Sequence, residues 1–307
     1  MNAVATSQCT DASRSWLAGG YRRTFAIAGI GVEVTGDTPE STNLGALQAF
    51  AASGESCDIE LRVEWQSALA PCGRELFNSG CVWTVCEWGD RFVFDFATKR
   101  FSGQPYKRLL VDQEFRNATV VLNRQCLSPT DASRALEYPL DELLMTHHLS
   151  LGRGVELHAC GLMHSNGDAF LFAGHSGAGK STTARLWTRH SPARVLSDDR
   201  IIVRKQVGQF FMYGTPWHGE AAFALPASAP LRRVFLLEHG TGNRIAQVSR
   251  GAAAGELLAR SFTPFYAPRF VEPVLALLEE MAESVPCYRF QFVPDQSAVE
   301  KILGFHD

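Results

Sequence analysis

Hydrophobic and polar residues alternate in short runs along the first part of the chain. Residues 25–34, 59–66, 81–88, 91–103 and 118–127 are rich in Val, Phe and Ile, and Gly, Asn and Pro punctuate the chain around them. Alternation with a period of two, bounded by turn residues, is typical of β-strands. The pattern therefore predicts a β-rich part over residues 21–140, which follows a segment at residues 1–20 that we expect to be disordered.

The hydrophobic period changes after this part. Residues 141–149 begin with an acidic residue and then place apolar residues at helical spacing, which predicts a helix. Residues 155–240 indicate alternating strands and helices, and residues 268–285 and 295–305 indicate two amphipathic helices around a strand at 287–293. We therefore expect a second part, residues 141–307, with an α/β nucleotide-binding fold.

Composition and charge narrow the class of protein. The chain has 307 residues, of which 46% are hydrophobic and 20% charged, and its formal net charge is -3. These values are typical of a globular protein. Its net charge is not positive, which argues against nucleic acid or an anionic membrane as the main partner. Its apolar runs fall short of the roughly 20 residues that span a bilayer, and the first twenty residues lack a secretory signal pattern. We expect a cytoplasmic protein and leave a homo-oligomer open.

The stretch LFAGHSGAGKSTTARLW, residues 171–187, matches the phosphate-binding pattern G-x-x-x-x-G-K-[ST] at every fixed position. A buried-strand run precedes the loop, and a helical run follows it. Glycines let the backbone wrap so that its N–H groups face phosphate oxygens, and the helix N-terminus adds partial positive charge. The predicted nucleotide-binding residues are Gly174, His175, Ser176, Gly177, Ala178, Gly179, Lys180, Ser181 and Thr182.

The residue types in this loop predict a bound ATP, or another nucleoside triphosphate, together with Mg²⁺. Lys180 is expected to neutralise the β and γ phosphates, and the Ser181 hydroxyl to ligate the metal ion. The alternative is a glycine-rich turn without a ligand.

Two neighbouring acids, Asp198 and Asp199, follow soon after the loop. The helix after the loop is expected to end near His190, because Ser191 and Pro192 stop it, and a strand then leads to the acids. A strand, helix and parallel strand unit returns the chain beside its start, which brings the acids next to the phosphates. One carboxylate is then available for Mg²⁺ and the other for the proton of an attacking hydroxyl. A solvated turn or helix-cap pair is the alternative.

Three elements of the sequence, taken together, resemble the HPr kinase/phosphorylase superfamily. In order along the chain they are His158 in ELHACGL, the loop GHSGAGKS and the acids in LSDDRIIV. The resemblance implies a mixed-sheet P-loop kinase core of the HPr kinase/phosphoenolpyruvate carboxykinase type, joined to the β-rich N-terminal part. It implies ATP-dependent phosphorylation of a serine hydroxyl, with Asp198 as base, His158 supporting it, and Asp199 with Ser181 holding Mg²⁺. His175 replaces the acidic residue usual in HPr enzymes, and the chain looks closer to the HPr kinase-like proteins that modify peptides, including lasso-peptide precursor kinases.

The segment YGTPWHGEAAF, residues 213–223, is the candidate for contact with the acceptor. It combines two glycines with Trp217, His218 and Glu220, which are able to cover and contact a peptide. The alternatives are a solvated hairpin end, or a Trp217 side chain that packs on the sheet. Arg232, Arg233, Arg260 and Arg269 are candidates for charge stabilisation, among which the sequence does not choose.

Together these features predict a cytoplasmic serine kinase. It would transfer the γ-phosphate of ATP to a hydroxyl of a peptide, a protein or a small serine-like acceptor. The alternative function is a nucleotide-binding regulatory module with weak ATPase activity, whose N-terminal part docks a partner. A carboxykinase would need further metal and oxaloacetate ligands, and we find none in the sequence.

Overall fold

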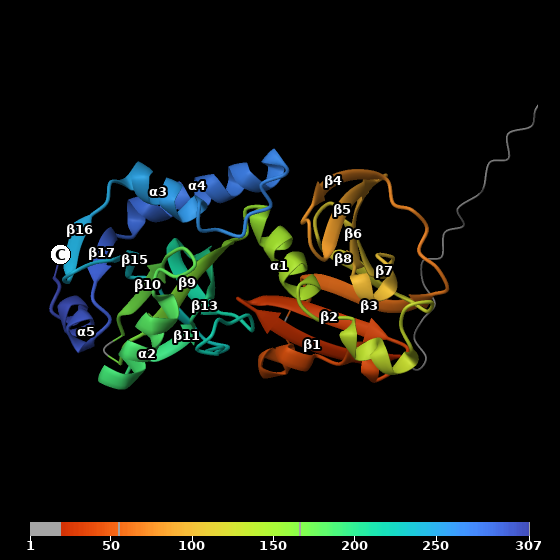
Figure 1. Cartoon of the computed structure of the whole chain (residues 1–307), viewed down its shortest axis with the longest axis horizontal. Helices are drawn as coiled ribbons and strands as arrows, with labels where there is room; N and C mark the ends of the chain where they lie inside the picture. The colour runs from red at the N-terminus through yellow and green to blue at the C-terminus, as the bar shows by residue number, and fades with distance from the viewer. Residues whose placement is uncertain (1–19, 55, 166, 307) are drawn as a thin grey trace, which may run out of the picture.

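The computed structural model describes residues 20–54, 56–165 and 167–306, and it contains two lobes that lie side by side (Figure 1). Each lobe is built on a mixed β-sheet, and the α-helices belong to the second lobe and to the junction between the two. The chain is thus a mixed α/β protein in which strands predominate. The predicted disorder of residues 1–20 concerns residues that lie, apart from Gly20, outside the described part.

The N-terminal lobe contains a sheet with the order β1-β2-β3-β8-β7-β6-β5-β4 within the described residues. Its strands are β1 (Tyr21–Ile27), β2 (Ile30–Gly36), β3 (Ile59–Gln66), β4 (Arg74–Asn78), β5 (Trp83–Trp88), β6 (Arg91–Ala97), β7 (Pro105–Asp112) and β8 (Asn117–Asn123). β3 runs parallel to both of its neighbours, β2 and β8, and the other pairs are antiparallel. The strand predictions for residues 25–34, 59–66, 81–88, 91–103 and 118–127 are confirmed in outline.

One face of this sheet forms the core of the N-terminal lobe. Val63, Val120, Leu109, Phe94 and Val85 follow one another in register across five strands, and each is buried. Successive side chains of a strand point to opposite faces, so the period-two pattern gathers these residues on one side. The short 3-10 helices η1 (Glu40–Thr42), η2 (Gly45–Phe50), η3 (Lys99–Phe101) and η4 (Pro129–Arg134) lie in the connections.

Helix α1 (Leu140–Ser150) joins the two lobes (Figure 1). It confirms the helix predicted for residues 141–149, with Asp141 and Glu142 in its first turn, where the helix dipole favours negative charge. Nearly every residue of this helix is buried, because it lies between the two sheets and packs against both β9 and α4.

The C-terminal lobe contains a second sheet, with the order β14-β13-β12-β9-β10-β15-β17-β16 and with β11 paired to β9. Its strands are β9 (Val155–Met163), β10 (Ala169–Ala173), β11 (Arg194–Ser197), β12 (Arg200–Gln206), β13 (Gln209–Gly214), β14 (Ser228–Pro230), β15 (Arg233–His239), β16 (Arg244–Gln247) and β17 (Cys287–Phe292). Among these described strands, the pairs β10–β15 and β15–β17 are parallel and the others antiparallel.

Helices cover both faces of the second sheet. α3 (Arg250–Leu258) and α4 (Pro268–Ser284) pack on one face, and α2 (Lys180–His190) and α5 (Gln296–Leu303) on the other. The predicted helices at 268–285 and 295–305 and the strand at 287–293 are confirmed, and the sequence analysis missed α3. Helices on both faces explain why β10, AFLFA, is apolar throughout and buried at every position.

The predicted alternation of strands and helices over residues 155–240 is confirmed for β10, α2 and β11 and is wrong for the rest of the range. After α2, the described chain forms six strands before the next α-helix. Val207 and Gly208 both have positive φ and join β12 to β13 in a tight antiparallel hairpin. Local hairpins therefore extend the sheet where the sequence analysis expected helical crossovers.

One hydrophobic core extends from the N-terminal lobe into the C-terminal lobe. Ile202, Tyr213, Trp217 and Phe270 of the C-terminal lobe pack with the core of the N-terminal lobe. Arg204 adds a hydrogen bond from Nη1 to the Ala28 carbonyl, 2.6 Å long.

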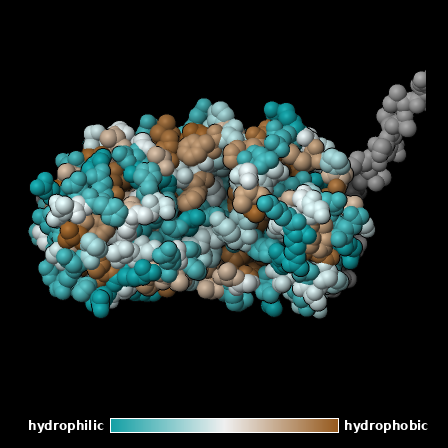
Figure 2. Space-filling view, viewed as in Figure 1, coloured by the Kyte–Doolittle hydropathy of each residue, from teal (hydrophilic) through white to brown (hydrophobic). Residues whose placement is uncertain are grey.

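Figure 2 shows hydrophilic residues over much of the visible face of the molecule. Within the described residues, no helix is long and apolar enough to cross a membrane.

Candidate functional site

The glycine-rich loop lies between β10 and α2, as its pattern predicted. Gly177 and Gly179 have φ angles of 80° and 100°, a region that favours glycine. A Cβ at Gly179 would also lie 2.7 Å from the Phe292 ring. The loop thus turns sharply into α2, whose first N–H groups have no side-chain cap and are available to an anion.

Lys180 lies inside this loop and is only 5% exposed. Its Nζ donates to the carbonyl oxygens of Gly174 and His175, both at 3.1 Å, and lies 3.7 Å from Oδ1 of Asp199. Burial, and then the nearby Arg200 guanidinium, lower the pKa of Lys180 to about 8. The ammonium is therefore held by two neutral carbonyl groups of the loop.

Asp198 is fully buried behind the loop. Its Oδ2 accepts hydrogen bonds from the Ser181 hydroxyl at 2.8 Å and from the Ala221 N–H at 3.0 Å. Its Oδ1 accepts from the N–H groups of Gly219 at 3.1 Å and Phe223 at 3.3 Å. Both oxygens of this carboxylate thus have two donors each, and the carboxylate is fixed in place.

Gly219 allows this close wrapping of the chain around Asp198. A Cβ at this position would lie 2.7 Å from Oδ2 of Asp198 and 3.2 Å from Oγ of Ser181. Any other residue would collide with the carboxylate that the segment contacts.

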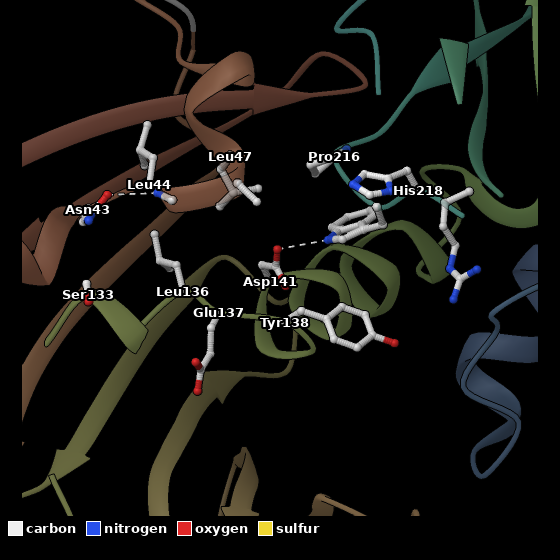
Figure 3. A pocket seen from close by; sticks show the side chains of 14 residues that line it. Asn43, Leu44, Leu47, Ser133, Leu136, Glu137, Tyr138, Asp141, Pro216 and His218 are labelled. Carbon is white, nitrogen blue, oxygen red and sulfur yellow. Dashed lines mark hydrogen bonds between the residues drawn. The ribbon is translucent and has the colours of Figure 1, made fainter. Parts of the chain in front are cut away.

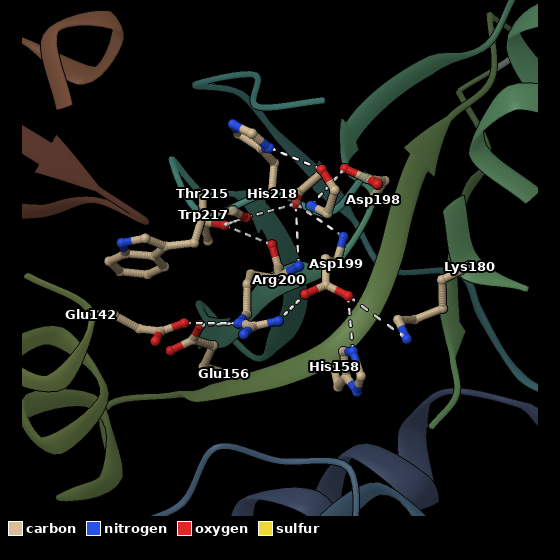
Figure 4. Close-up of polar contacts among 12 residues, drawn as sticks. Glu142, Glu156, His158, Lys180, Asp198, Asp199, Arg200, Thr215, Trp217 and His218 are labelled. Atoms are coloured by element: carbon tan, nitrogen blue, oxygen red, sulfur yellow. Dashed lines mark hydrogen bonds and ion pairs between the residues drawn. The ribbon is translucent and has the colours of Figure 1, made fainter. Parts of the chain in front are cut away.

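Asp199 has a different environment and is partly open to solvent, with 20% of its side chain exposed. Its Oδ1 accepts a hydrogen bond of 2.8 Å from Nε2 of His158, and Arg200 Nη1 pairs with its Oδ2 (Figure 4). Burial, together with Lys180 and Arg200, lowers the pKa of His158 to about 4. Because a carboxylate oxygen only accepts hydrogen bonds, Nε2 of His158 is the donor in this contact.

The structure pairs these residues differently from the sequence-based expectation. The resemblance paired Asp198 with His158 and Asp199 with Ser181, whereas the structure pairs Ser181 with Asp198 and His158 with Asp199. Both acids lie in the bend between β11 and β12, where the first points toward the loop and the second toward β9.

The order of strands explains the position of His158. The expected unit of strand, helix and adjacent parallel strand is wrong in detail, because β11 does not pair with β10. Instead β9 lies between them and is antiparallel to both. His158 is on β9, so its carbonyl accepts from the Gly174 N–H at 3.2 Å while its ring reaches Asp199.

A buried acidic pair and one arginine complete the site, and the sequence analysis missed all three. Arg200 Nε donates to Oε1 of Glu142 at 2.8 Å, and its guanidinium lies 4.1 Å from the centre of the Phe262 ring. Glu156 accepts a 2.6 Å hydrogen bond from Thr146, while its Oε1 has no hydrogen-bond partner. Burial, and then Glu142, raise the pKa of Glu156 well above its usual range. Arg200 directly follows the paired acids in the chain, which was the available signal.

The candidate acceptor segment lies beside Asp198, but its three named residues differ in environment. Trp217 is 7% exposed, belongs to the shared core and donates from Nε1 to Oδ2 of Asp141 at 3.0 Å. His218 and Glu220 are exposed. Trp217 thus packs in the interior, which is the alternative that we considered for it. Of the three residues, only the exposed His218 and Glu220 are free to contact an acceptor directly.

Of the four arginines considered for charge stabilisation, Arg233 lies 5.8 Å from the centre of the Phe305 ring, and two others form hydrogen bonds to backbone carbonyls. Arg260 Nη1 donates to the Glu256 carbonyl at 2.6 Å, and Arg269 Nη2 donates to the Gln113 carbonyl at 2.8 Å. Arg200, which pairs directly with Asp199, is the better placed arginine.

Magnesium fits the oxygen donors at Ser181 and Asp198. In the described part of the chain, no group of three or more His, Cys, Asp or Glu side chains is arranged to hold a metal ion. Mg²⁺ does not need such a group, because it usually binds one or two protein oxygens together with phosphates and waters. A hydroxyl and a carboxylate 2.8 Å apart, at the start of α2, are a donor set of this kind.

Comparisons with known proteins give limited similarity. The family described as "SynChlorMet cassette protein ScmC" matches residues 141–293. The solved structure of the HPr(Ser) kinase/phosphatase from Coxiella burnetii is similar over 48% of this chain and 93% of that chain, with 13% sequence identity and a TM-score of 0.29. No curated protein matches. A functional assignment must therefore rest on the geometry of the site.

Proposed function

We propose that this chain is a kinase that transfers the γ-phosphate of ATP, with Mg²⁺, to a serine-type hydroxyl of a peptide, a protein or a small acceptor. The observation that supports this most directly is the division of the two acids: Asp198 is buried against Ser181, and Asp199 is partly exposed beside Lys180 and His158. A module that only binds nucleotide would have no need of the second, exposed acid.

The loop and Lys180 bind the phosphates in this proposal. The N–H groups at the start of α2 face the phosphate oxygens, and the Lys180 ammonium exchanges the Gly174 and His175 carbonyls for β and γ oxygens. Charged phosphates next to the ammonium would also raise the lysine pKa from about 8, so the lysine stays protonated.

Ser181 and Asp198 are the residues that would hold Mg²⁺. The ion, when bound, neutralises charge on the phosphates. The N–H groups of Gly219, Ala221 and Phe223 hold the Asp198 carboxylate oriented toward Ser181.

Asp199 takes the proton of the acceptor hydroxyl in this proposal. The hydroxyl oxygen forms a bond to the γ-phosphorus, the bond from that phosphorus to the β–γ bridging oxygen breaks, ADP leaves, and the proton passes to Asp199. The Nε2–H of His158 and the guanidinium of Arg200 orient the carboxylate. This assigns the base to Asp199, where the sequence-based expectation gave Asp198, because Asp199 is partly exposed beside Lys180 while the Asp198 carboxylate faces Ser181 and three backbone N–H groups.

The test is to incubate the protein with Mg²⁺, γ-labelled ATP and serine-containing peptides or free serine, and to follow the label. Label in acid-stable phosphoserine supports the proposal. Label that reaches only inorganic phosphate would favour the alternative, a regulatory module with weak ATPase activity.

A further inference from the structure

A pocket of about 420 Å³ opens where the two lobes meet (Figure 3). The N-terminal lobe contributes residues of η2, including Leu47, and the residues just before it, including Leu44. The connection before α1 contributes Leu136. The C-terminal lobe contributes Pro216 and Trp217. The volume lies in the range of sites that bind small molecules, roughly 300–1,000 Å³.

This pocket adjoins the proposed transfer site. Arg200 lines it and also pairs with Asp199. His218 lines it as well, and the next residue, Gly219, donates its N–H to Asp198. The Arg200 side chain therefore lies between the pocket and Asp199, and the peptide bond from His218 to Gly219 lies between the pocket and Asp198.

The walls of the pocket favour an apolar occupant. Leucine, proline and tryptophan side chains form much of its surface, and the acids that reach it already have partners. Asp141 accepts the Trp217 N–H, and Glu137 pairs with Arg134. Both acids thus already have donors, and an apolar side chain in the pocket would leave these contacts in place.

We propose that this interlobe pocket binds an apolar side chain of the acceptor, close in sequence to the hydroxyl that is phosphorylated. The inference rests on the proposed kinase function and adds to it that the acceptor is a peptide or protein segment, selected in part by the N-terminal lobe. Free serine carries no group that would occupy the pocket.

Two exposed alanines of η2 give a matched pair of variants. Ala46 lines the pocket, whereas Ala49, on the same short helix and also exposed, does not. Ala46→Trp would fill the pocket without entering the core, and Ala49→Trp adds the same bulk outside it.

The probe is a set of glycine-rich peptides with one serine, in which each of the three positions on either side is Leu, Phe, Gly or Asp. We expect Leu or Phe at one position to raise kcat/KM about 10-fold over Gly, the effect of burying one apolar side chain. Ala46→Trp should abolish this preference and leave the affinity for ATP unchanged, and Ala49→Trp should keep it. The inference is overturned by equal rates for all peptides and free serine, or by a preference that survives Ala46→Trp.

Binding of the same peptides separates this inference from the kinase proposal. Fluorescein-labelled peptides are titrated with protein in the presence of Mg²⁺ and a non-hydrolysable ATP analogue, and anisotropy is measured. Apolar peptides that bind the wild type and Ala49→Trp but not Ala46→Trp, without any phosphorylation, would support the pocket and contradict the kinase. Phosphorylation that Ala46→Trp does not change would support the kinase and overturn the pocket. Binding that does not depend on the residues flanking the serine would also overturn the pocket.

Discussion

Both lobes bury charged side chains, but they do so in different ways. In the N-terminal sheet, Arg108 and Asp95 are directly opposite on β7 and β6 and form two hydrogen bonds, of 2.6 and 2.8 Å. Each charge of this pair is matched by the other. In the C-terminal sheet, Asp199 is shared among His158, Arg200 and Lys180, and it remains partly exposed.

The difference separates charges that hold the fold from charges that are available for chemistry. A closed pair such as Arg108 with Asp95 has no capacity for a further ligand, and removing one member leaves an uncompensated charge. The donors around Asp199 belong to three different elements, and a ligand can exchange with them. Variants of the closed pair should therefore affect stability, and variants of the residues around Asp199 should affect binding and transfer.

The largest effect on activity is expected from Asp199→Asn. The amide cannot accept the hydroxyl proton, so the rate of transfer should fall by roughly 100- to 10,000-fold, as for other general bases. Rapid-quench measurement of phosphoserine gives this rate, and a thermal melt should show little change. Asp198→Asn is the companion variant: it should raise the Mg²⁺ concentration needed for activity. If both variants transfer phosphate at the wild-type rate, the division of roles between the acids is wrong.

The largest effect on stability is expected from Arg108→Ala, in the other lobe. It leaves Asp95 buried without its partner, and urea unfolding should show a loss of about 3–5 kcal/mol. Arg74 pairs with Glu87 across β4 and β5 in the same sheet, but both are exposed, so Arg74→Ala should cost no more than about 1 kcal/mol. If folded Arg108→Ala protein binds ATP with the wild-type affinity, the contrast between the lobes is sharper. If Arg108→Ala and Arg74→Ala lose similar amounts of unfolding free energy, the contrast is removed.

A somewhat smaller effect is expected from Lys180→Ala. Loss of the ammonium inside the loop should weaken ATP binding by roughly 30- to 150-fold, the equivalent of about 2–3 kcal/mol for a charged hydrogen bond. Isothermal titration calorimetry measures it, with Lys205→Ala as control, because Lys205 is exposed and pairs with Glu280 on the surface. Equal affinities of the two variants would contradict the role of the loop in phosphate binding.

The smallest effect concerns pH and His148, which lies at the junction of the lobes on α1. Burial, and then Arg153, lower the pKa of His148 to about 4, below the usual value near 6.5. The unfolded state therefore binds the proton first as pH falls, and stability is lost between pH 6.5 and 4, by up to about 1.4 kcal/mol per pH unit for this group. Asp141, whose pKa burial raises to about 6, acts in the opposite direction over the same range.

His148→Gln isolates the histidine contribution. The Gln amide can donate to the Phe115 carbonyl, as Nδ1 of His148 does at 3.0 Å, but it does not titrate. Unfolding free energies measured from pH 4.5 to 7 should fall less steeply with falling pH in the variant. Parallel curves for the two proteins would show that His148 is not the group responsible.

The sequence by itself determined the features that depend on neighbouring residues. Gly177 and Gly179 supply the positive φ angles of the loop, an apolar strand precedes them, and a helix follows, so the loop could be located from the order of residues alone. The period of the apolar residues located α1, α4 and α5 for the same reason. These signals are local, because backbone conformation and the period of a helix depend on residues a few positions apart.

Only the tertiary structure decided which side chains meet at the site. Asp198 and Asp199 are adjacent and chemically identical, and their partners depend on β9 lying between β10 and β11, an order that no local pattern encodes. The contact of Arg200 with Glu142, and the pocket where the lobes meet, join residues far apart in the chain. Such contacts arise from the packing of whole sheets and helices around a shared core, and this packing depends on the entire chain at once.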